Sequence, residues 1–117
     1  MSNVNERYLA CWNETEPAAR RKLIEDLWAQ DASYVDPIAE AHGREAIDAT
    51  IAAVQERFPD FVFTALGAAD AHHGVARFSW GLGPDGAEPV VIGFDVTVSD
   101  DAGRLMSVVG FLDQVPG

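Results

Sequence analysis

The second half of the chain, after Pro59, restricts the fold most because it consists of four strand-like segments joined by short turns. Each turn contains a glycine at a position where the backbone needs a positive φ. Connections as short as these join antiparallel neighbours. The sequence therefore predicts an antiparallel sheet with strands near residues 61–70, 75–83, 88–99 and 104–113.

The first half has the apolar spacing of helices instead. We expect helices over residues 4–13, from Pro17 onwards, and from Gly43 up to Pro59, because the apolar residues there repeat with the period of a helix. A short strand over residues 32–36 precedes the third helix. The predicted class is α+β, with the helices packed against one face of a curved antiparallel sheet.

Composition indicates a single acidic domain over residues 1–117. A hydrophobic content of 48% suits a chain with a real core, and the length of 117 residues leaves little room for a second domain. The net charge of −11 disfavours nucleic acid and anionic membranes as partners. The polar N-terminus lacks a signal-peptide pattern, and the lone Cys11 fits a reducing compartment, so we expect a cytoplasmic protein.

Sequence motifs for metal or nucleotide binding are absent, and so are those for serine catalysis. The histidines, His42, His72 and His73, lack the spacing of metal ligands. The glycines of residues 81–86 join two strands, whereas a phosphate-binding loop opens a helix. Cys11 lies among apolar residues, which favours packing over nucleophilic catalysis. We therefore expect no metal ion and no cofactor.

Two aspartates on predicted strands are the candidates for chemistry. Asp36 ends the short strand and shares a face with Tyr34. Asp95 lies in the middle of an apolar strand, on the same face as Gly93 and Thr97. That face either meets solvent, the usual place for an aspartate, or lines a ligand cavity while the opposite apolar face packs elsewhere. The residues alone leave both readings open.

Short motifs are distributed over essentially the whole chain: Arg7-Tyr8, Trp28 to Ala32 leading into Val35-Asp36-Pro37, His42-Gly43-Arg44-Glu45, Asp95-Val96 and Gly103-Arg104-Leu105. In their order and spacing they resemble the nuclear transport factor 2-like superfamily, above all its SnoaL-like and ketosteroid isomerase-like branches. The resemblance implies a cone-shaped, bent antiparallel sheet that wraps around the N-terminal helices and encloses an apolar pocket.

The resemblance to ketosteroid isomerase also implies roles for three side chains. Asp36 matches the general base, Asp95 matches the acid of the oxyanion hole, and Tyr8 matches the phenol beside that acid. An ionised base and a buried, neutral carboxyl would let one site remove a proton and stabilise the enolate that forms. Trp28 and Ile51 stand near positions where that isomerase has supporting tyrosines. The implied pocket lining is Trp12, Tyr34, Trp28, Ile51 and Phe58.

Several functions fit these features. The first is a cofactor-free, isomerase-type enzyme that transfers a proton on an apolar carbonyl compound, and the alternative is a non-catalytic module that binds a small apolar ligand or a protein. A polyketide cyclase would use Asp95 or Asp113 as its acid, and an epoxide hydrolase would combine Arg77 with Asp36 and Asp95. We expect Arg77 instead to lie at the surface, paired with a carboxylate. We also expect a homodimer through the outer face of the sheet.

Overall fold

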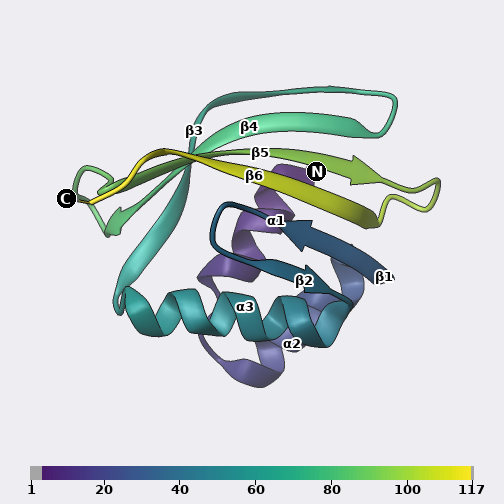
Figure 1. Ribbon diagram of the computed structural model, residues 1–117, viewed down its shortest axis with the longest axis horizontal. Coiled ribbons are helices and arrows are strands. Elements are labelled where there is room, and N and C mark those ends of the chain that lie inside the picture. The colour runs from purple at the N-terminus through teal and green to yellow at the C-terminus, as the bar shows by residue number, and fades with distance from the viewer. Residues whose placement is uncertain (1–3, 117) are drawn as a thin grey trace.

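The computed structural model describes residues 4–116 and has three helices on one side of a six-stranded sheet (Figure 1). The helices are α1 (Val4–Asn13), α2 (Pro17–Leu27) and α3 (Arg44–Arg57). The strands are β1 (Trp28–Val35), β2 (Glu40–His42), β3 (Phe61–His72), β4 (Val75–Pro84), β5 (Val91–Ser99) and β6 (Leu105–Gln114).

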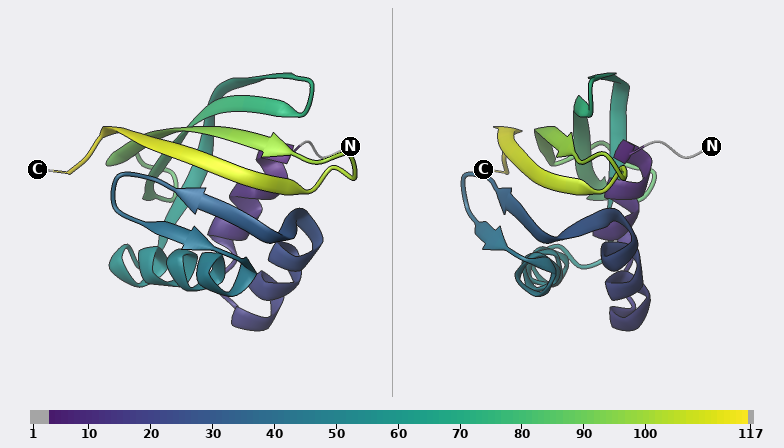
Figure 2. Two further views of the ribbon diagram at one scale, coloured as in Figure 1. Left: turned by 45° about the vertical axis from the view of Figure 1, so that its right-hand side comes forward. Right: turned by 90° about the vertical axis from the view of Figure 1, so that its right-hand side faces the viewer.

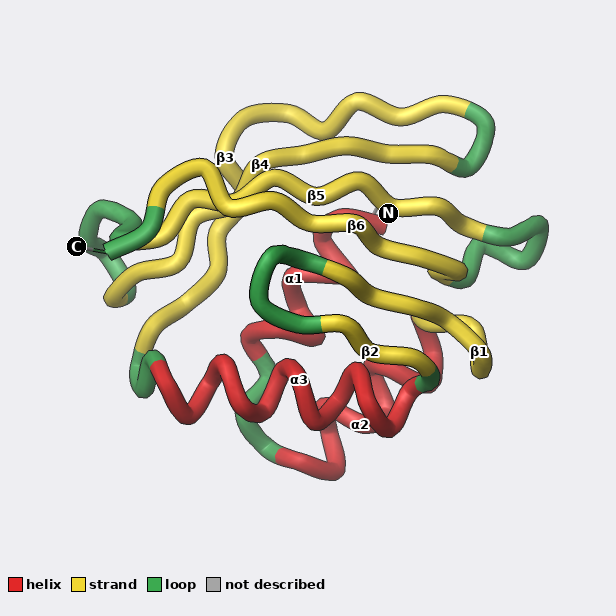
Figure 3. Tube along the Cα trace, viewed as in Figure 1, coloured by secondary structure: helices red, strands yellow, loops and turns green. Residues whose placement is uncertain are grey.

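The strands form one curved layer in the order β2-β1-β6-β5-β4-β3, and the sheet does not close on itself (Figure 3). The helices lie on the concave side of this layer, as the view along the sheet in Figure 2 shows. The predicted α+β class and cone-like shape are therefore confirmed.

The second half of the chain folds as predicted. β3, β4, β5 and β6 pair antiparallel in chain order, and the turns between them contain Gly74, Gly86 and Gly103, all with positive φ. Within this meander Asp95 of β5 is paired with Phe78 of β4 and Gly110 of β6. The register therefore places Asp95 in the interior of the sheet, on a strand that has a paired neighbour on each side.

The prediction of a wholly antiparallel sheet is wrong for one pair of strands, because β1 pairs with β6 in parallel. The two strands are separated in the sequence by β2, α3 and the first three strands of the meander. Short turns specify antiparallel neighbours, whereas a strand that returns after so long a connection can add to the edge in either direction.

The sequence also placed the start of β1 too late and missed β2. β1 begins at Trp28, immediately after α2, where the backbone N–H of Trp28 still bonds to the carbonyl of Ile24. β2 has three residues, too few for an alternating pattern, and it pairs antiparallel with the end of β1. The tight connection between them begins at Asp36, whose N–H bonds to the carbonyl of Ala39 at 2.9 Å.

Contacts at the start of α3 hold this helix in its place over the sheet. Gly43 precedes α3 with a φ of 86°, and its N–H bonds to the carbonyl of Ala32 in β1 at 2.7 Å. The Arg44 guanidinium then donates two hydrogen bonds to the carbonyl of Trp28, at 3.0 and 2.8 Å. These contacts fasten the start of α3 to the first residue and to the middle of β1.

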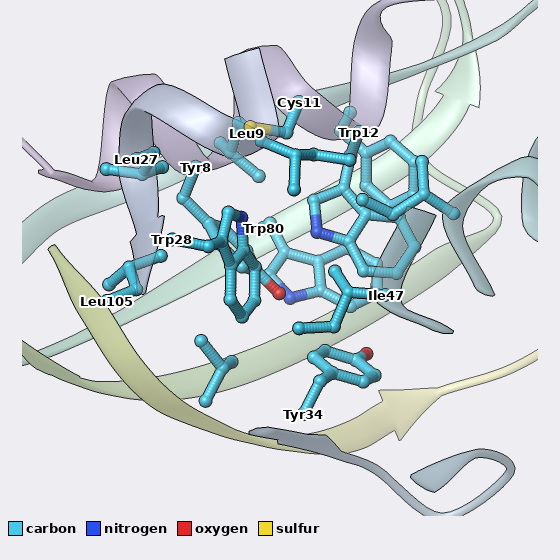
Figure 4. Close-up of a cluster of buried hydrophobic side chains, with 14 of the residues drawn as sticks. Tyr8, Leu9, Cys11, Trp12, Leu27, Trp28, Tyr34, Ile47, Trp80 and Leu105 are labelled. Atoms are coloured by element: carbon cyan, nitrogen blue, oxygen red, sulfur yellow. The ribbon is translucent and has the colours of Figure 1, made fainter. Parts of the chain in front are cut away.

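The core lies between the helices and the concave face of the sheet. Its centre is a cluster of aromatic side chains from α1, β1, β3 and β4 (Figure 4). Tyr8 contacts both Trp12 and Trp28. Phe63 lies between Trp12 and Trp80 and contacts both rings. No helix within residues 4–116 is long and apolar enough to cross a membrane.

Candidate active site

A cavity of about 890 Å³ lies among α1, α3 and the concave face of the sheet. Such a volume is within the range of small-molecule sites. Most of its wall is apolar, and the polar side chains in that wall include Tyr8, Tyr34, Asp36 and Asp95. The apolar wall includes Leu9, Trp12, Val54, Phe58, Phe63, Trp80, Leu82 and Leu112.

Asp95 faces this cavity from β5 and is 1% exposed. Gly93 and Thr97 are buried on the same face, while Phe94 and Val96 on the opposite face are half-buried. The polar side of β5 therefore points inward, and the apolar side points outward. Of the two readings that the sequence left open, the buried one is correct.

Burial raises the pKa of the Asp95 carboxyl to about 6, and the negative charge of Asp36 adds to this rise. The Tyr8 hydroxyl and the Trp80 indole lie close enough to favour the ionised form and oppose the shift. Neither group satisfies Asp95 fully, because its Oδ1 is buried without a hydrogen-bond partner among the described residues. Asp95 is thus a carboxyl that can hold its proton near neutral pH.

Asp36 has a different environment at the end of β1. Its Oδ1 accepts hydrogen bonds from the backbone N–H groups of Ile38 and Ala39, both at 2.8 Å. Its Oδ2 accepts one from the Tyr34 hydroxyl at 2.5 Å. The residue is half-buried. Three donors aimed at two oxygens suit an ionised carboxylate, which can only accept.

The two phenols of the site remain protonated. Burial, followed by the charge of Asp95, raises the pKa of Tyr8 well above its usual value. Burial and the hydrogen bond to Asp36 raise the pKa of Tyr34 in the same way. Each hydroxyl can therefore donate: Tyr34 to Asp36, and Tyr8 toward Asp95 or toward a ligand oxygen beside it.

Gly110 of β6 lies between the two aspartates. A Cβ atom at this position would lie 2.7 Å from Asp95 Oδ1 and 3.4 Å from the Cβ of Asp36. β6 is the strand between β1 and β5, so the absence of a side chain here lets the two carboxyl-bearing strands face a common space. Sequence reasoning missed Gly110, although a glycine inside an apolar strand often marks such a close approach.

Trp80 is a second residue of the site that sequence reasoning missed. Its ring lies against Gly93, where a Cβ would come within 2.0–2.6 Å of the indole atoms. Its Nε1–H is buried without a hydrogen-bond partner among residues 4–116, and the ring forms part of the cavity wall. The inward-facing Gly93 was the available signal, because a glycine opposite an aromatic residue leaves room for that ring.

The model of the SnoaL-like domain family matches residues 5–108, which is most of the chain. The protein belongs to the SnoaL-like family. A search of curated proteins finds no match. The family therefore rests on the domain match and on the solved structures that resemble this chain.

Among these structures is a "putative isomerase of the SnoaL-like family" from Agrobacterium tumefaciens, which is 39% identical with a TM-score of 0.90 and 94% of each chain covered. A "putative polyketide cyclase" from Sinorhizobium meliloti is 16% identical, with a TM-score of 0.72 and 94% of each chain covered. A protein with a ketosteroid isomerase-like fold from Catenulispora acidiphila, in complex with trimethylamine, is 22% identical with a TM-score of 0.72. That match covers 92% of this chain and 82% of the other. The last two comparisons show the shared fold alone.

In this SnoaL-like domain the structure brings together most of the residues proposed for the site. Tyr8, Asp36 and Asp95 line the cavity, and Trp12, Tyr34 and Phe58 do so as well. Trp28 and Ile51 do not: both are fully buried in the core and form no part of the cavity wall. Trp28 is kept out of the cavity wall because its ring packs behind Tyr8, with 5.8 Å between the ring centroids. Ile51 lies on the face of α3 that contacts the core together with Ile47.

The residues proposed for the alternative chemistries lie elsewhere. Arg77 is 65% exposed and pairs with Asp70 at 3.2 Å, the surface pairing expected for it. Asp113 is exposed and is not in the cavity wall. His42 is exposed beside Glu40, and Arg44 is the residue that fastens the start of α3. Within residues 4–116, the cavity wall contains no histidine and no cluster of side chains could hold a metal ion.

Proposed function

We propose that this SnoaL-like protein is a cofactor-free enzyme that moves a proton between two carbon atoms of an apolar carbonyl compound. The observation that supports this most is the pair of carboxyl groups in one apolar cavity with opposite environments. Asp36 accepts three hydrogen bonds, whereas Asp95 is desolvated and has an unpartnered oxygen. Such a pair suits an acid and a base that act together.

Asp36 is the proposed base. Its Oδ2 would take a proton from a carbon next to the substrate carbonyl, and the electron pair of that C–H bond would move onto the carbonyl oxygen as an enolate. Asp36 would then return the proton to a second carbon, so the substrate is isomerised and the enzyme is unchanged. A carboxylate oxygen has two acceptor sites, so the bond from Tyr34 to Oδ2 leaves one of them free.

Asp95 and Tyr8 are the proposed donors to the enolate oxygen. The charge on that oxygen develops during the reaction, so donors fixed in advance stabilise the transition state more than the substrate. Asp95 can donate only while it holds its proton. Its pKa is about 6, so the protonated fraction falls as the pH rises above 6. Exclusion of water by a bound apolar substrate would raise that pKa further.

The direct test is a spectrophotometric assay with a β,γ-unsaturated ketosteroid, which follows the appearance of the conjugated enone. Wild type would be compared with Asp36→Asn and, as a matched control, with Asp113→Asn, an exposed aspartate outside the cavity. We expect turnover by wild type and by the control, and a loss of at least a hundredfold in Asp36→Asn. Equal turnover by all three proteins would contradict the role of Asp36.

The hydrogen bonds to both oxygens of Asp36 support a second candidate, a non-catalytic module that binds a small apolar ligand. A carboxylate engaged by three donors can serve to hold the loop after β1 in place. This alternative predicts that ligand affinity survives Asp36→Asn and that neither protein turns over the ketosteroid. Absence of turnover in wild type would therefore favour the binding module over the enzyme.

A further inference from the structure

Arg57 is the only basic residue among the cavity-lining residues of the described chain. It lies in the last turn of α3, four residues after Ala53 and eight after Ala49, and all three side chains line the cavity. Residues four apart follow one face of a helix. A row of small side chains along the cavity therefore ends in a guanidinium group, about 12 Å along the helix axis from Ala49.

Arg57 lies on the open side of the cavity, along which Ala49 and Ala53 of α3 are exposed as well. It is exposed although it lines the wall, and Val115 and Pro116, near the C-terminal end of the described chain, line the wall as well and are exposed. The guanidinium is thus at the boundary between the cavity and solvent. A ligand that extends out of the apolar interior would meet it there.

The Arg57 side chain has no hydrogen bond or ion pair to any residue within 4–116. Most other basic side chains of this protein are engaged by carboxylates or backbone carbonyls, as in Arg20–Asp48, Arg21–Glu25, Lys22–Asp26, Arg77–Asp70 and Arg44–Trp28. In a chain with 19 acidic residues, a cation without an acidic partner at a cavity opening is available to a ligand.

The inner part of the cavity has different chemistry. The Trp12 indole lies near the Tyr8 hydroxyl and the Trp80 indole near the Asp95 carboxyl, and neither N–H makes a well-formed hydrogen bond within residues 4–116. A ligand acceptor oxygen at this end would meet the Tyr8 hydroxyl, which keeps its proton and can donate. The cavity therefore offers donors inside, apolar wall between, and a cation at the opening.

We propose that Arg57 selects ligands with an anionic group, so that the natural substrate is an amphipathic carbonyl compound with a carboxylate or another anion at its outer end. The orientation, with the carbonyl oxygen among the inner donors, rests on the proposed function. The preference for an anion is independent of the proposed function, because it follows from the unpaired guanidinium at the opening. The negative net charge of the protein repels anions in general, so an anionic ligand needs such a local cation to bind.

A matched pair of fluorescent probes tests this inference. 2-Naphthol has a hydroxyl for the inner donors, and 6-hydroxy-2-naphthoate is the same molecule with a carboxylate at the opposite edge. Their dissociation constants would be measured at low ionic strength for wild type, Arg57→Gln, Arg57→Lys and the control Arg77→Gln. Arg77→Gln removes the same charge from a residue outside the cavity.

For wild type we expect the carboxylate to improve binding about threefold, as for an exposed ion pair, and added salt to reduce this gain. Arg57→Gln should abolish the gain and leave the affinity for 2-naphthol unchanged, while Arg57→Lys and Arg77→Gln should keep it. The same comparison with naphthyl phosphate and naphthalenesulfonate would show whether the site prefers one kind of anion.

The inference would be overturned if the carboxylate improved binding equally in wild type and Arg57→Gln. It would also be overturned if Arg77→Gln lost that improvement as Arg57→Gln does, because the effect would then come from the net charge of the protein. Ala53→Trp, which fills the cavity, should abolish binding of both probes; if neither probe binds to wild type, the inference also fails. Neither probe is turned over. A charge preference at Arg57 without turnover of the ketosteroid would therefore contradict isomerisation of that steroid and leave this inference intact.

Discussion

Asp95 is a single residue whose requirements for function and for stability conflict. Its carboxyl is almost fully removed from water, and one oxygen lacks a hydrogen-bond partner among the described residues. Burial of this kind penalises the ionised form. A chain that retains such a group in the middle of β5 loses stability at the pH where the group is charged, and the proposed donor role offers a reason to retain it.

The first prediction is that Asp95→Asn stabilises the protein at high pH. The pKa of Asp95 is raised from 3.8 to about 6 in the folded state, so the folded state binds this proton more tightly than the unfolded state. Its contribution to stability is therefore complete below about pH 4 and is lost as the pH rises through 6. The loss is on the order of 3 kcal/mol for a shift of about two units. The asparagine variant avoids it.

Chemical denaturation of wild type and Asp95→Asn at pH 4 and pH 8 measures this effect. We expect a higher free energy of unfolding for the variant at pH 8, by about 1–3 kcal/mol, and a much smaller difference at pH 4. Asp113→Asn, at an exposed position, should show no such pH-dependent gain. A variant that is less stable than wild type at pH 8 would mean that Asp95 is better satisfied than its environment indicates.

At the scale of elements, the spacing of the two aspartates depends on three adjacent strands. Asp36 follows β1, Asp95 is on β5, and β6 lies between them with Gly110 at the point of approach. Gly110 is paired directly with Asp95 in the sheet. The geometry of the site therefore depends on a residue that has no chemistry of its own.

The second prediction is that Gly110→Ala impairs the site more than the fold. The added methyl group would lie 2.7 Å from Asp95 Oδ1, so the carboxyl must move. We expect a stability cost of about 1–2 kcal/mol and a decrease in kcat for the ketosteroid of tenfold or more, because small displacements of reacting groups slow catalysis strongly.

A double-mutant cycle with Asp95→Ala distinguishes a local clash from general damage. Without the carboxyl, the alanine at position 110 keeps only the Asp36 Cβ, at 3.4 Å, as a tight neighbour, so it should cost less stability in that background. If Gly110→Ala costs the same in both backgrounds, the cost arises from the backbone of β6 and not from Asp95.

The strands of the second half could be predicted from the sequence because alternation and turn glycines are local signals. β2 could not, since three residues carry no period, and the parallel pairing of β1 with β6 is a contact between segments far apart in the chain. The site shows the same limit. Alternation assigned Asp95 to a face but not to the inside, and it gave no indication that the Trp80 ring lies against Gly93. These features depend on which strands meet across the core.

At the scale of the whole molecule, the convex side of the sheet is apolar and uncovered. Phe94 and Val96 of β5 are paired with Phe111 and Val109 of β6 on this outer face. Phe111 is 52% exposed and Val109 40%, and Met106 nearby on β6 is 49% exposed. An exposed apolar surface of this kind is typical of a protein interface.

The third prediction is a homodimer through this outer face. Analytical ultracentrifugation of wild type should show a dimer at micromolar concentration, and added salt should strengthen it, because each copy carries a charge of −11. Phe111→Asp should give a monomer, while Gln30→Asp, at an exposed position on β1 outside the patch, should not. A wild type that stays monomeric at every salt concentration would contradict this expectation.

The account depends above all on Asp95 as a buried carboxyl that keeps its proton near neutral pH and is influenced by Asp36 in the same cavity. An NMR titration of ¹³C-labelled aspartate carboxyls, with Asp95 assigned by the signal missing in Asp95→Asn, measures this directly. We predict a midpoint near pH 6 in wild type and a lower midpoint in Asp36→Asn, because the charge of Asp36 helps to raise the pKa of Asp95. A midpoint near the ordinary value of 3.8, unchanged in Asp36→Asn, would contradict the account.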